Sequence, residues 1–195
     1  MTTMTQNELY ISVDIETSGP IPGEYSMLSL GACVVGDAQR NFYAELVPLN
    51  DNFTEEAMET CDLSLTELRN HGTEPHAAME KFAAWVGEVR EGRWPVFVGF
   101  NAVFDWSFVN YYFIRFCGPE TNPFGHSAID IKSYYMGAFG TSWAETSMRR
   151  LPPEIHAPDK PLAHNALDDA MQQGEIFERL LQAREALSIV RQTAP

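Results

Sequence analysis

The stretch LYISVDIE, residues 9–16, decides how the rest of the chain is interpreted. Its odd-numbered residues are apolar and its even-numbered residues are polar, which predicts a β-strand with one face on a hydrophobic core. The polar face carries Asp14 and Glu16, and Cα atoms two residues apart on a strand are separated by about 6.5 Å. Two carboxylates so placed can converge on a metal ion. Acids on the solvent face of a strand are also common, so the pair alone does not identify a site.

The chain around this strand predicts an α/β domain. Two more strands are expected at 27–35 and 41–47, joined by a turn at Gly36-Asp37, so the first three strands form an antiparallel meander. Two short strands follow, at 95–100 and 128–131. Helices are expected at 55–61, 63–70, 75–90, 102–116, 132–136, 143–150 and 166–189. This order predicts a mixed five-stranded sheet with helices on both faces.

Composition and charge limit the class of protein. The 195 residues include 13 Lys+Arg and 27 Asp+Glu, a net charge of −14, and 45% are hydrophobic, which fits a folded chain and not a disordered one. We expect a flexible N-terminal tail at residues 1–7 and a single domain at 8–190. The negative charge argues against a protein that holds long nucleic acid on a broad basic surface. It is compatible with an enzyme that holds a few phosphates through metal ions.

The sequence predicts neither export nor a membrane span. Its first residues lack a basic segment followed by an apolar run. The apolar stretch 94–114 contains Pro95, Gly99 and several polar side chains, which predicts a buried strand followed by a buried helix. The three widely spaced cysteines are typical of buried thiols in a reducing compartment. We therefore expect a soluble, cytoplasmic protein that binds no membrane.

Two later segments, 101–105 and 165–169, repeat the pattern Asn-Ala-x-x-Asp. In each, the asparagine is a suitable N-cap residue, so the aspartate lies in the first turn of a helix. His164 comes just before the second cap, where its ring can reach the mouth of that helix. Asp168 lies about 100° around the helix from its neighbour, which points it toward solvent or the rim of a site. The alternative is that these acids only complement helix dipoles and that the histidine is an ordinary surface residue.

The interpretation of these residues as ordinary surface or helix-capping groups becomes weaker when the three motifs are considered together. Four acids would form one cluster: Asp14, Glu16, Asp105 and Asp169. Such a cluster repels itself, and two divalent ions roughly 3.5–4 Å apart would neutralise it. Hard oxygen ligands favour Mg²⁺ or Mn²⁺. A histidine beside the cluster is suited to taking a proton from water near neutral pH.

The order of these motifs resembles that of the DEDDh exonucleases, which include ribonuclease T, oligoribonuclease and the proofreading subunits of DNA polymerase III. Asp-x-Glu lies on the first strand, Asn-Ala-x-Phe-Asp at mid-chain and His-x-Ala-x-x-Asp near the C-terminus, and the resemblance spans residues 9–181. It implies a ribonuclease H-like fold and 3′→5′ removal of nucleoside 5′-monophosphates from a nucleic-acid end. Because some relatives are dimers, it also implies a homodimer.

The resemblance also assigns roles to individual residues. The metal ligands, for two Mg²⁺ with Mn²⁺ as a substitute, would be Asp14, Glu16, Asp105 and Asp169. His164 would act as the general base that deprotonates a metal-activated water, which then attacks the terminal phosphorus in line. Asp130 matches a family aspartate on a neighbouring strand. It and Asp168 are expected to support the site without binding metal.

Substrate contacts are expected beside the motifs, at Thr17, Ile21, Asn101, Phe104, Phe108, Arg149 and Arg150. Relatives usually follow Asp-x-Glu-Thr with Thr-Gly and a bulky apolar residue that wedges between terminal bases. Because this chain has Ser-Gly-Pro-Ile at 18–21, Ile21 or Met27 would have to serve. The aromatic residues Phe104, Trp106 and Phe108 can stack on bases, and the alternative is that they belong to the core.

Basic residues are few. Arg149, Arg150 and Lys160 precede His164 and are expected to contact phosphates, with solvated loop charges as the alternative. So few cations favour short oligonucleotides, single-stranded 3′ ends or delivery by a partner. The choice between RNA and DNA stays open, because no motif encodes contacts to the 2′-hydroxyl. Two other functions remain: hydrolysis of a small phosphodiester or dinucleotide on the same fold, and a catalytically silent nucleic-acid-binding module.

Overall fold

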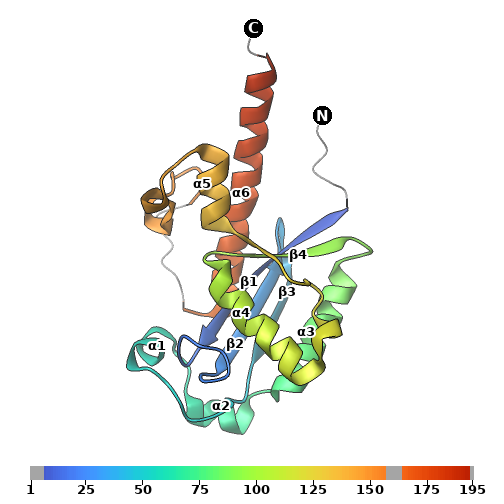
Figure 1. Ribbon diagram of the computed structural model, residues 1–195, viewed down its shortest axis with the longest axis vertical. Helices are drawn as coiled ribbons and strands as arrows, with labels where there is room; N and C mark the ends of the chain where they lie inside the picture. The colour runs from blue at the N-terminus through green and yellow to red at the C-terminus, as the bar shows by residue number, and fades with distance from the viewer. Residues whose placement is uncertain (1–6, 157–163, 194–195) are drawn as a thin grey trace.

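The computed structural model describes residues 7–156 and 164–193, the last of these by backbone alone after residue 186. Its centre is a five-stranded sheet in the order β3-β2-β1-β4-β5 (Figure 1). The strands are β1 (Glu8–Thr17), β2 (Met27–Val34), β3 (Asp37–Glu45), β4 (Trp94–Gly99) and β5 (Ala128–Asp130). β1, β2 and β3 pair antiparallel, whereas β4 pairs parallel with β1 and with β5. The predicted mixed sheet is confirmed, and the strand that carries the Asp-x-Glu pair lies in its middle.

The helices also lie close to their predicted positions. They are α1 (Glu55–Thr60), α2 (Leu65–His71), α3 (Pro75–Val89), α4 (Ala102–Tyr112), α5 (Ile131–Phe139) and α6 (Ala166–Thr193). The chain after α4 continues as a π-helical segment, Phe113–Cys117, so the predicted helix reaches its expected length with a wider last turn. It ends at Gly118, whose φ of 96° suits a residue without a side chain.

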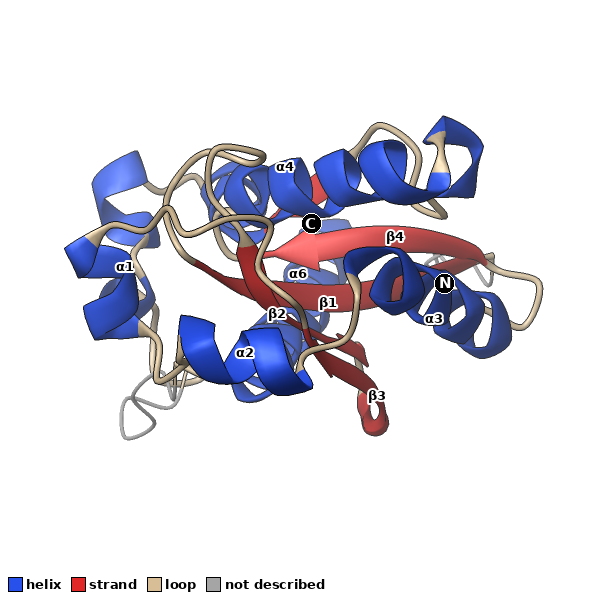
Figure 2. Cartoon of the chain, turned by 90° about the horizontal axis from the view of Figure 1, so that it is seen from below, coloured by secondary structure: helices blue, strands red, loops and turns tan. Residues whose placement is uncertain are grey.

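Helices cover both faces of the sheet. The apolar face of β1 packs in one core with α3 and α4, where Phe82 and Tyr112 are fully buried. The Tyr112 hydroxyl accepts a hydrogen bond from the Met27 backbone N–H at 2.7 Å, which ties α4 to the start of β2. Figure 2 shows β1 and β4 side by side with α4 alongside them. The elements on this face therefore fix α4 relative to the strand that bears the acids.

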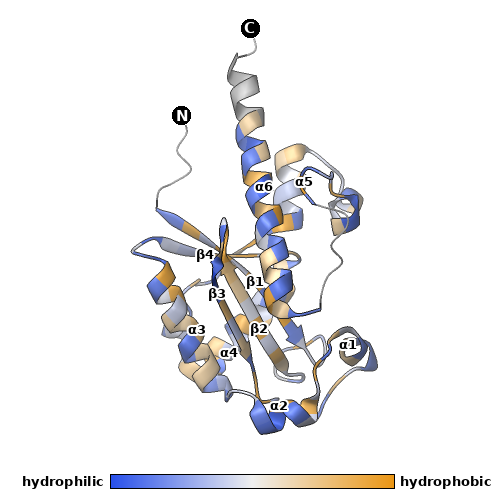
Figure 3. Ribbon diagram, turned by 180° about the vertical axis from the view of Figure 1, so that it is seen from behind, coloured by the Kyte–Doolittle hydropathy of each residue, from blue (hydrophilic) through white to orange (hydrophobic). Residues whose placement is uncertain are grey.

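The other face of β1, the polar one, is covered by α6. Figure 3 shows this helix running across the sheet, and a second core forms around Val98, Phe177 and Leu180. Close approach of α6 depends on Gly31 of β2, because a Cβ at this position would overlap the backbone carbonyl of Ala166. Gly31 lies opposite Asp14 in the sheet. The missing side chain thus lets the first turn of α6 reach the polar face of β1.

One predicted helix is wrong. Residues 143–150 form two short 3₁₀ turns, Trp143–Thr146 and Met148–Arg150, separated by Ser147 in an extended conformation. The side chains of Ser142 and Glu145 form a capping box, and the Thr146 hydroxyl donates to the Trp143 carbonyl. The capping box supports the start of the first turn, whereas a hydroxyl bond to the carbonyl three residues earlier, as at Thr146, competes with a regular helix.

The apolar stretch 94–114 forms β4 and α4 as predicted. Across the described residues, no helix combines the length and the apolar character that crossing a membrane requires.

Candidate active site

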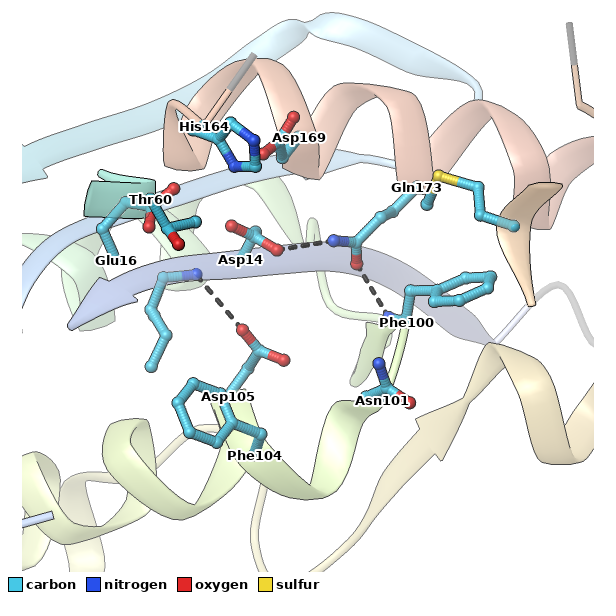
Figure 4. Close-up of a pocket in the computed structure, with 12 residues that line it drawn as sticks. Asp14, Glu16, Thr60, Phe100, Asn101, Phe104, Asp105, His164, Asp169 and Gln173 are labelled. Carbon is cyan, nitrogen blue, oxygen red and sulfur yellow. Dashed lines mark hydrogen bonds between the residues drawn. The ribbon is translucent and has the colours of Figure 1, made fainter. Parts of the chain in front are cut away.

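A pocket of about 390 Å³ lies at the ends of β1 and β4, where the first turns of α4 and α6 meet (Figure 4). α1 and the 3₁₀ turn Met148–Arg150 also reach its wall. The lining residues are Asp14, Ile15, Glu16, Thr60, Phe100, Asn101, Phe104, Asp105, Met148, His164, Asp169 and Gln173. All five residues that carry the sequence motifs therefore come together, although they are up to 155 positions apart in the chain.

Three carboxylates form the closest group in the pocket. Asp14 and Glu16 project from β1 and Asp169 from α6, and one carboxylate oxygen of each lies within 4.8 Å of the others. The pairing of β1 with β2 shifts register between Glu16 and Thr17, and such irregularities often redirect side chains beside a site. A divalent cation fits this group because carboxylate oxygens are hard ligands and, among the described residues that line the pocket, no lysine or arginine separates them.

The pKa values of two of these carboxyl groups are raised, because the groups are buried and close to one another. Burial, followed by repulsion from Asp105, Glu16 and Asp169, raises the pKa of Asp14 well above its ordinary value. Burial and the charge of Asp169 raise the pKa of Glu16 to about 7. Without a cation the protein thus holds protons on acids that would be ionised in water. Bound divalent ions would supply the missing positive charge.

Asp105 reaches the same pocket but occupies a different position in it. Its Oδ1 accepts a hydrogen bond at 3.2 Å from the backbone N–H of Ile15, the residue between Asp14 and Glu16. Burial raises the pKa of Asp105 to about 8, against the lowering effect of backbone hydrogen bonds. Asp105 is not one of the three closely spaced carboxylates. Through Oδ1 it holds the backbone of β1 from the α4 side, and its role as a fourth metal ligand stays a prediction.

The two asparagines of the repeated pattern behave differently. The Asn165 side chain caps α6, because its Oδ1 accepts from the N–H groups of Leu167 and Asp168 at 3.0 and 3.3 Å. The predicted side-chain cap by Asn101 is wrong: this residue has a left-handed backbone with φ of 67° and makes no capping hydrogen bond. The carboxylate of Asp130 accepts from the Ala102 N–H at 3.1 Å instead.

Asp130 also caps a second helix. Its Oδ1 accepts from the N–H and the hydroxyl of Ser133 at 2.8 and 2.6 Å, at the start of α5. The predicted supporting position of Asp130 therefore takes the form of a bridge between α4 and α5. Asp168 is exposed and does not line the pocket.

His164 lies at the mouth of the pocket, exposed to solvent (Figure 4). Its backbone has φ of 51°, so His164 and Asn101 are two of the three non-glycine residues with positive φ in the described ranges. Such conformations cost free energy and concentrate at functional sites. The preceding residues 157–163, which include Lys160, lie outside the described residues.

The predicted substrate contacts divide into two groups. Asn101 and Phe104 line the pocket, and Ile21 is 52% exposed on the loop after β1. Phe108, by contrast, is fully buried and has no surface for a base, so its assignment as a contact is wrong. Met27 is fully buried as well, which leaves Ile21 as the candidate wedge.

The remaining contacts lie around the pocket and not in its wall. Thr17 is buried, and its hydroxyl donates to the Gly19 carbonyl at 2.9 Å, which shapes the loop that carries Ile21. Trp106 is half-buried and packs against the core. Arg149 and Arg150 are exposed and do not line the pocket.

Gln173 is the main residue that the sequence motifs did not identify. This buried side chain donates from Nε2 to Asp14 Oδ1 at 2.5 Å and accepts the Phe100 N–H on Oε1 at 2.8 Å (Figure 4). It joins α6, β1 and the end of β4, and so orients Asp14. Its position four residues after Asp169 puts both side chains on one helix face, a signal that the sequence does contain. Thr60, Phe100 and Met148 carry no comparable signal.

Comparisons with known proteins agree with this geometry. Residues 11–177 match the family model described as exonuclease. The chain is 47% identical over 174 residues to the 3′-5′ DNA exonuclease Cap18 of Escherichia coli, with 89% of this chain and 91% of that protein covered.

Solved structures share the fold. The nuclease domain of 3′hExo, a DEDDh family member bound to rAMP, superposes with a TM-score of 0.73 at 12% identity, covering 92% of this chain and 94% of that one. Exonuclease I of E. coli in complex with a dT13 oligonucleotide gives a TM-score of 0.65 at 18% identity, covering 94% of this chain and 43% of that one.

Proposed function

The chain belongs to the DEDDh family of 3′→5′ exonucleases, and we propose that its pocket hydrolyses the terminal phosphodiester at the 3′ end of single-stranded or short DNA. The product would be a nucleoside 5′-monophosphate, and the cofactor would be two Mg²⁺ ions or Mn²⁺ in their place. The convergence of Asp14, Glu16 and Asp169 carboxylates within 4.8 Å is the observation that carries this proposal.

Each residue has a separate task in the proposed reaction. Asp14, Glu16 and Asp169 would hold the divalent ions, which supply an activated water and neutralise charge on the phosphate. Asp105 fixes the Ile15 N–H and thereby the spacing of the two acids on β1. Gln173 fixes the direction of the Asp14 carboxylate.

His164 would accept the proton of the attacking water. It lies at the open mouth of the pocket and immediately precedes Asn165, the cap residue of α6. Because the cap holds the start of the helix, the backbone next to the histidine is fixed while the ring remains exposed. A proton taken there can leave directly to solvent.

Three observations support the proposed substrate. The relative that is 47% identical is named as a DNA exonuclease. The cavity of about 390 Å³ has the size of a small-molecule site and suits one nucleotide, not a duplex. The net charge of −14 disfavours a long strand lying on the surface.

The test is cleavage of 5′-labelled DNA and RNA oligomers with Mg²⁺, Mn²⁺ or EDTA. We expect a ladder that shortens from the 3′ end of DNA with metal and is absent with EDTA. Asp14→Ala should abolish it, and His164→Ala should slow it by about 10²- to 10⁴-fold. The exposed residues Asp62 and His126 lie outside the pocket wall, so Asp62→Ala and His126→Ala serve as matched controls.

Other outcomes would redirect or end the proposal. Cleavage of dinucleotides alone would favour the small-phosphodiester alternative. No metal-dependent cleavage of any oligomer would contradict the proposed function. The homodimer implied by the family is a separate part of the proposal, and light scattering on the purified protein tests it: a monomer mass would exclude it.

A further inference from the structure

The pocket wall offers few positive groups to the phosphates of a nucleic-acid strand. Among the residues that the structure describes, it contains no lysine or arginine. Divalent ions would serve the phosphate that is cleaved, but a strand carries a further phosphate on the nucleotide that precedes it. That phosphate needs its own positive partner outside the wall, because each neutralised phosphate contributes strongly to nucleic-acid binding.

Lys132 lies next to the wall of the pocket. It lies in the first turn of α5, and its Nζ donates to Oδ1 of the wall residue Asn101 at 3.0 Å. The same Nζ lies 4.3 Å from the centre of the Trp143 ring. Both partners are neutral, and within the described parts of the chain no carboxylate forms an ion pair with Lys132.

Some other cations in the described ranges are paired with acids, and Arg149 and Arg150, which are exposed near the pocket, do not line its wall. Arg40, Arg69 and Arg179 each form an ion pair with an acid. A paired cation has little net charge to offer a phosphate, whereas a lysine held by an amide oxygen and an aromatic face keeps both its charge and free donors.

Trp143 completes the arrangement. It begins the first 3₁₀ turn after α5 and is 56% exposed, although Lys132 lies against its ring. An exposed indole held beside a cation is the combination by which proteins bind single strands, with the base stacked on the ring and the phosphate on the cation. The contact with Lys132 fixes the orientation of the ring before a base arrives.

The opposite side of the mouth repels a strand. α1, which contributes Thr60 to the wall, exposes Glu55, Glu56 and Glu59. Figure 1 shows α1 below the start of α6 and the segment after α5 above it. The side of α5 and Trp143, residues 131–146 of the described chain, carries one exposed acid, Glu145, which accepts two hydrogen bonds from Ser142. With Lys132 beside Trp143, this side repels a polyanion less than the three glutamates of α1 do.

We propose that Lys132 and Trp143 form a subsite for the nucleotide that precedes the scissile phosphodiester, with its phosphate on Lys132 and its base on the indole of Trp143. This inference rests on the proposed function. The Lys132 contact also turns the Asn101 amide so that its oxygen faces the lysine and its nitrogen faces the pocket (Figure 4). The subsite is thus continuous with the wall of the reaction site.

The experiment compares two substrates of the full-length protein. One is a single-stranded thymidine oligomer, and the other is the p-nitrophenyl ester of thymidine 5′-monophosphate, which has a scissile phosphodiester but no preceding nucleotide. Variants are Lys132→Met, Lys132→Arg and Trp143→Ala. Lys81→Met on α3 and Trp94→Ala at the start of β4 remove an exposed cation and an exposed indole away from the pocket.

For the oligomer, Lys132→Met should raise KM about tenfold with kcat nearly unchanged, as expected for one charge-assisted phosphate contact. The dependence of log KM on log salt should become shallower by about 0.7, the value for one phosphate of a single strand. Lys132→Arg should retain the salt dependence, and Trp143→Ala should raise KM about tenfold. Hydrolysis of the ester should be unchanged in Trp143→Ala and in both controls. In Lys132→Met it should fall less than hydrolysis of the oligomer does, because this variant also frees the Asn101 amide that faces the pocket.

Two results would overturn the subsite. One is an unchanged KM and salt dependence in Lys132→Met. The other is an equal loss on the oligomer and the ester, which would mean that Lys132 only holds Asn101 in place. If the wild-type protein cleaved neither substrate, the proposed function would fail. Fluorescence anisotropy with a phosphorothioate-linked oligomer would still decide whether Lys132 and Trp143 bind the strand, because it needs no cleavage.

Discussion

Helices α4 and α6 both begin with Asn-Ala-x-x-Asp, and both deliver an aspartate to one pocket. In α6 the asparagine caps the helix with its own side chain. In α4 the asparagine has a left-handed backbone, Asp130 of the neighbouring strand takes over the capping, and Lys132 binds the free amide oxygen. The same five-residue pattern is therefore capped by its own side chain in α6, and by a residue distant in sequence in α4.

The difference extends to the two aspartates. Asp169 joins the carboxylates of Asp14 and Glu16, whereas Asp105 accepts the Ile15 N–H. One helix thus supplies a candidate metal ligand and the other braces the strand that bears the other ligands. The pattern predicts that a carboxylate reaches the pocket, but the neighbours of each helix decide what the carboxylate does there.

The largest expected effect separates these two aspartates. Asp169→Asn should lower the cleavage rate by roughly a thousandfold and weaken Mn²⁺ binding, because metal stabilisation of the reacting phosphate is worth several kcal/mol. Asp105→Asn keeps an oxygen for the Ile15 N–H and should lose much less Mn²⁺ affinity. Calorimetric Mn²⁺ titration and single-turnover cleavage measure the two quantities. Equal losses of Mn²⁺ affinity would remove the distinction between the helices.

The next effect concerns the approach of α6 alone. Gly31→Ala would force the Ala166 backbone away from β2, so we expect a loss of about 1–3 kcal/mol in the free energy of unfolding and a large loss of activity. Gly87→Ala is the control, because a Cβ there meets nothing within 4 Å. It should stabilise α3 by up to about 1 kcal/mol. Urea denaturation checks both, and a neutral Gly31→Ala would contradict the close contact.

A smaller effect is the pH dependence of the metal-free protein. The pKa values of Glu16 and Asp105, about 7 and about 8, lie above their ordinary values, so the folded state keeps protons that the unfolded state has lost. Stability should therefore fall as pH rises from about 5 to about 8. With EDTA, Tm should decline by several degrees over this range, and saturating Mg²⁺ should flatten the decline. A Tm that rises with pH in EDTA would contradict the claim that folding raises the pKa values of these acids.

The smallest effect compares the two asparagines. Asn165→Ala removes a true cap and should cost about 1 kcal/mol of stability, or about 2–4 °C in Tm. Asn101→Gly suits the positive φ and removes no cap, so Tm should be unchanged or slightly higher. It should still lower activity, because the amide that faces the pocket is lost. A lower Tm in Asn101→Gly than in Asn165→Ala would contradict the conclusion that only Asn165 caps its helix with its side chain.

The sequence predicts the parts of this molecule that depend on local pattern. Alternation in β1 and the apolar run 95–100 give the two central strands, and the spacing of the three motifs gives the five residues of the pocket. Prediction from the sequence fails for features that depend on contacts between distant segments. Nothing in the local pattern shows that Asp130 replaces Asn101 as a cap, and for Phe108 the pattern left both a base contact and the core open.

Two further differences have local physical causes that the motifs did not cover. The 143–150 segment breaks into two 3₁₀ turns at Ser147, whose backbone is extended, next to Thr146, whose hydroxyl donates to the Trp143 carbonyl. Gln173 becomes part of the site because it follows Asp169 by one helical turn and finds Phe100 across the sheet. Neither pattern carries a catalytic motif.

The central claim is that Asp14, Glu16 and Asp169 together hold a divalent ion while Asp105 braces β1. Anomalous diffraction from crystals of the protein with Mn²⁺ tests it most directly. The account predicts a Mn²⁺ peak bonded to carboxylate oxygens of all three residues, with the Asp105 to Ile15 hydrogen bond intact. The absence of a peak at this position, or a peak bonded by Asp105 in place of Asp169, would contradict it.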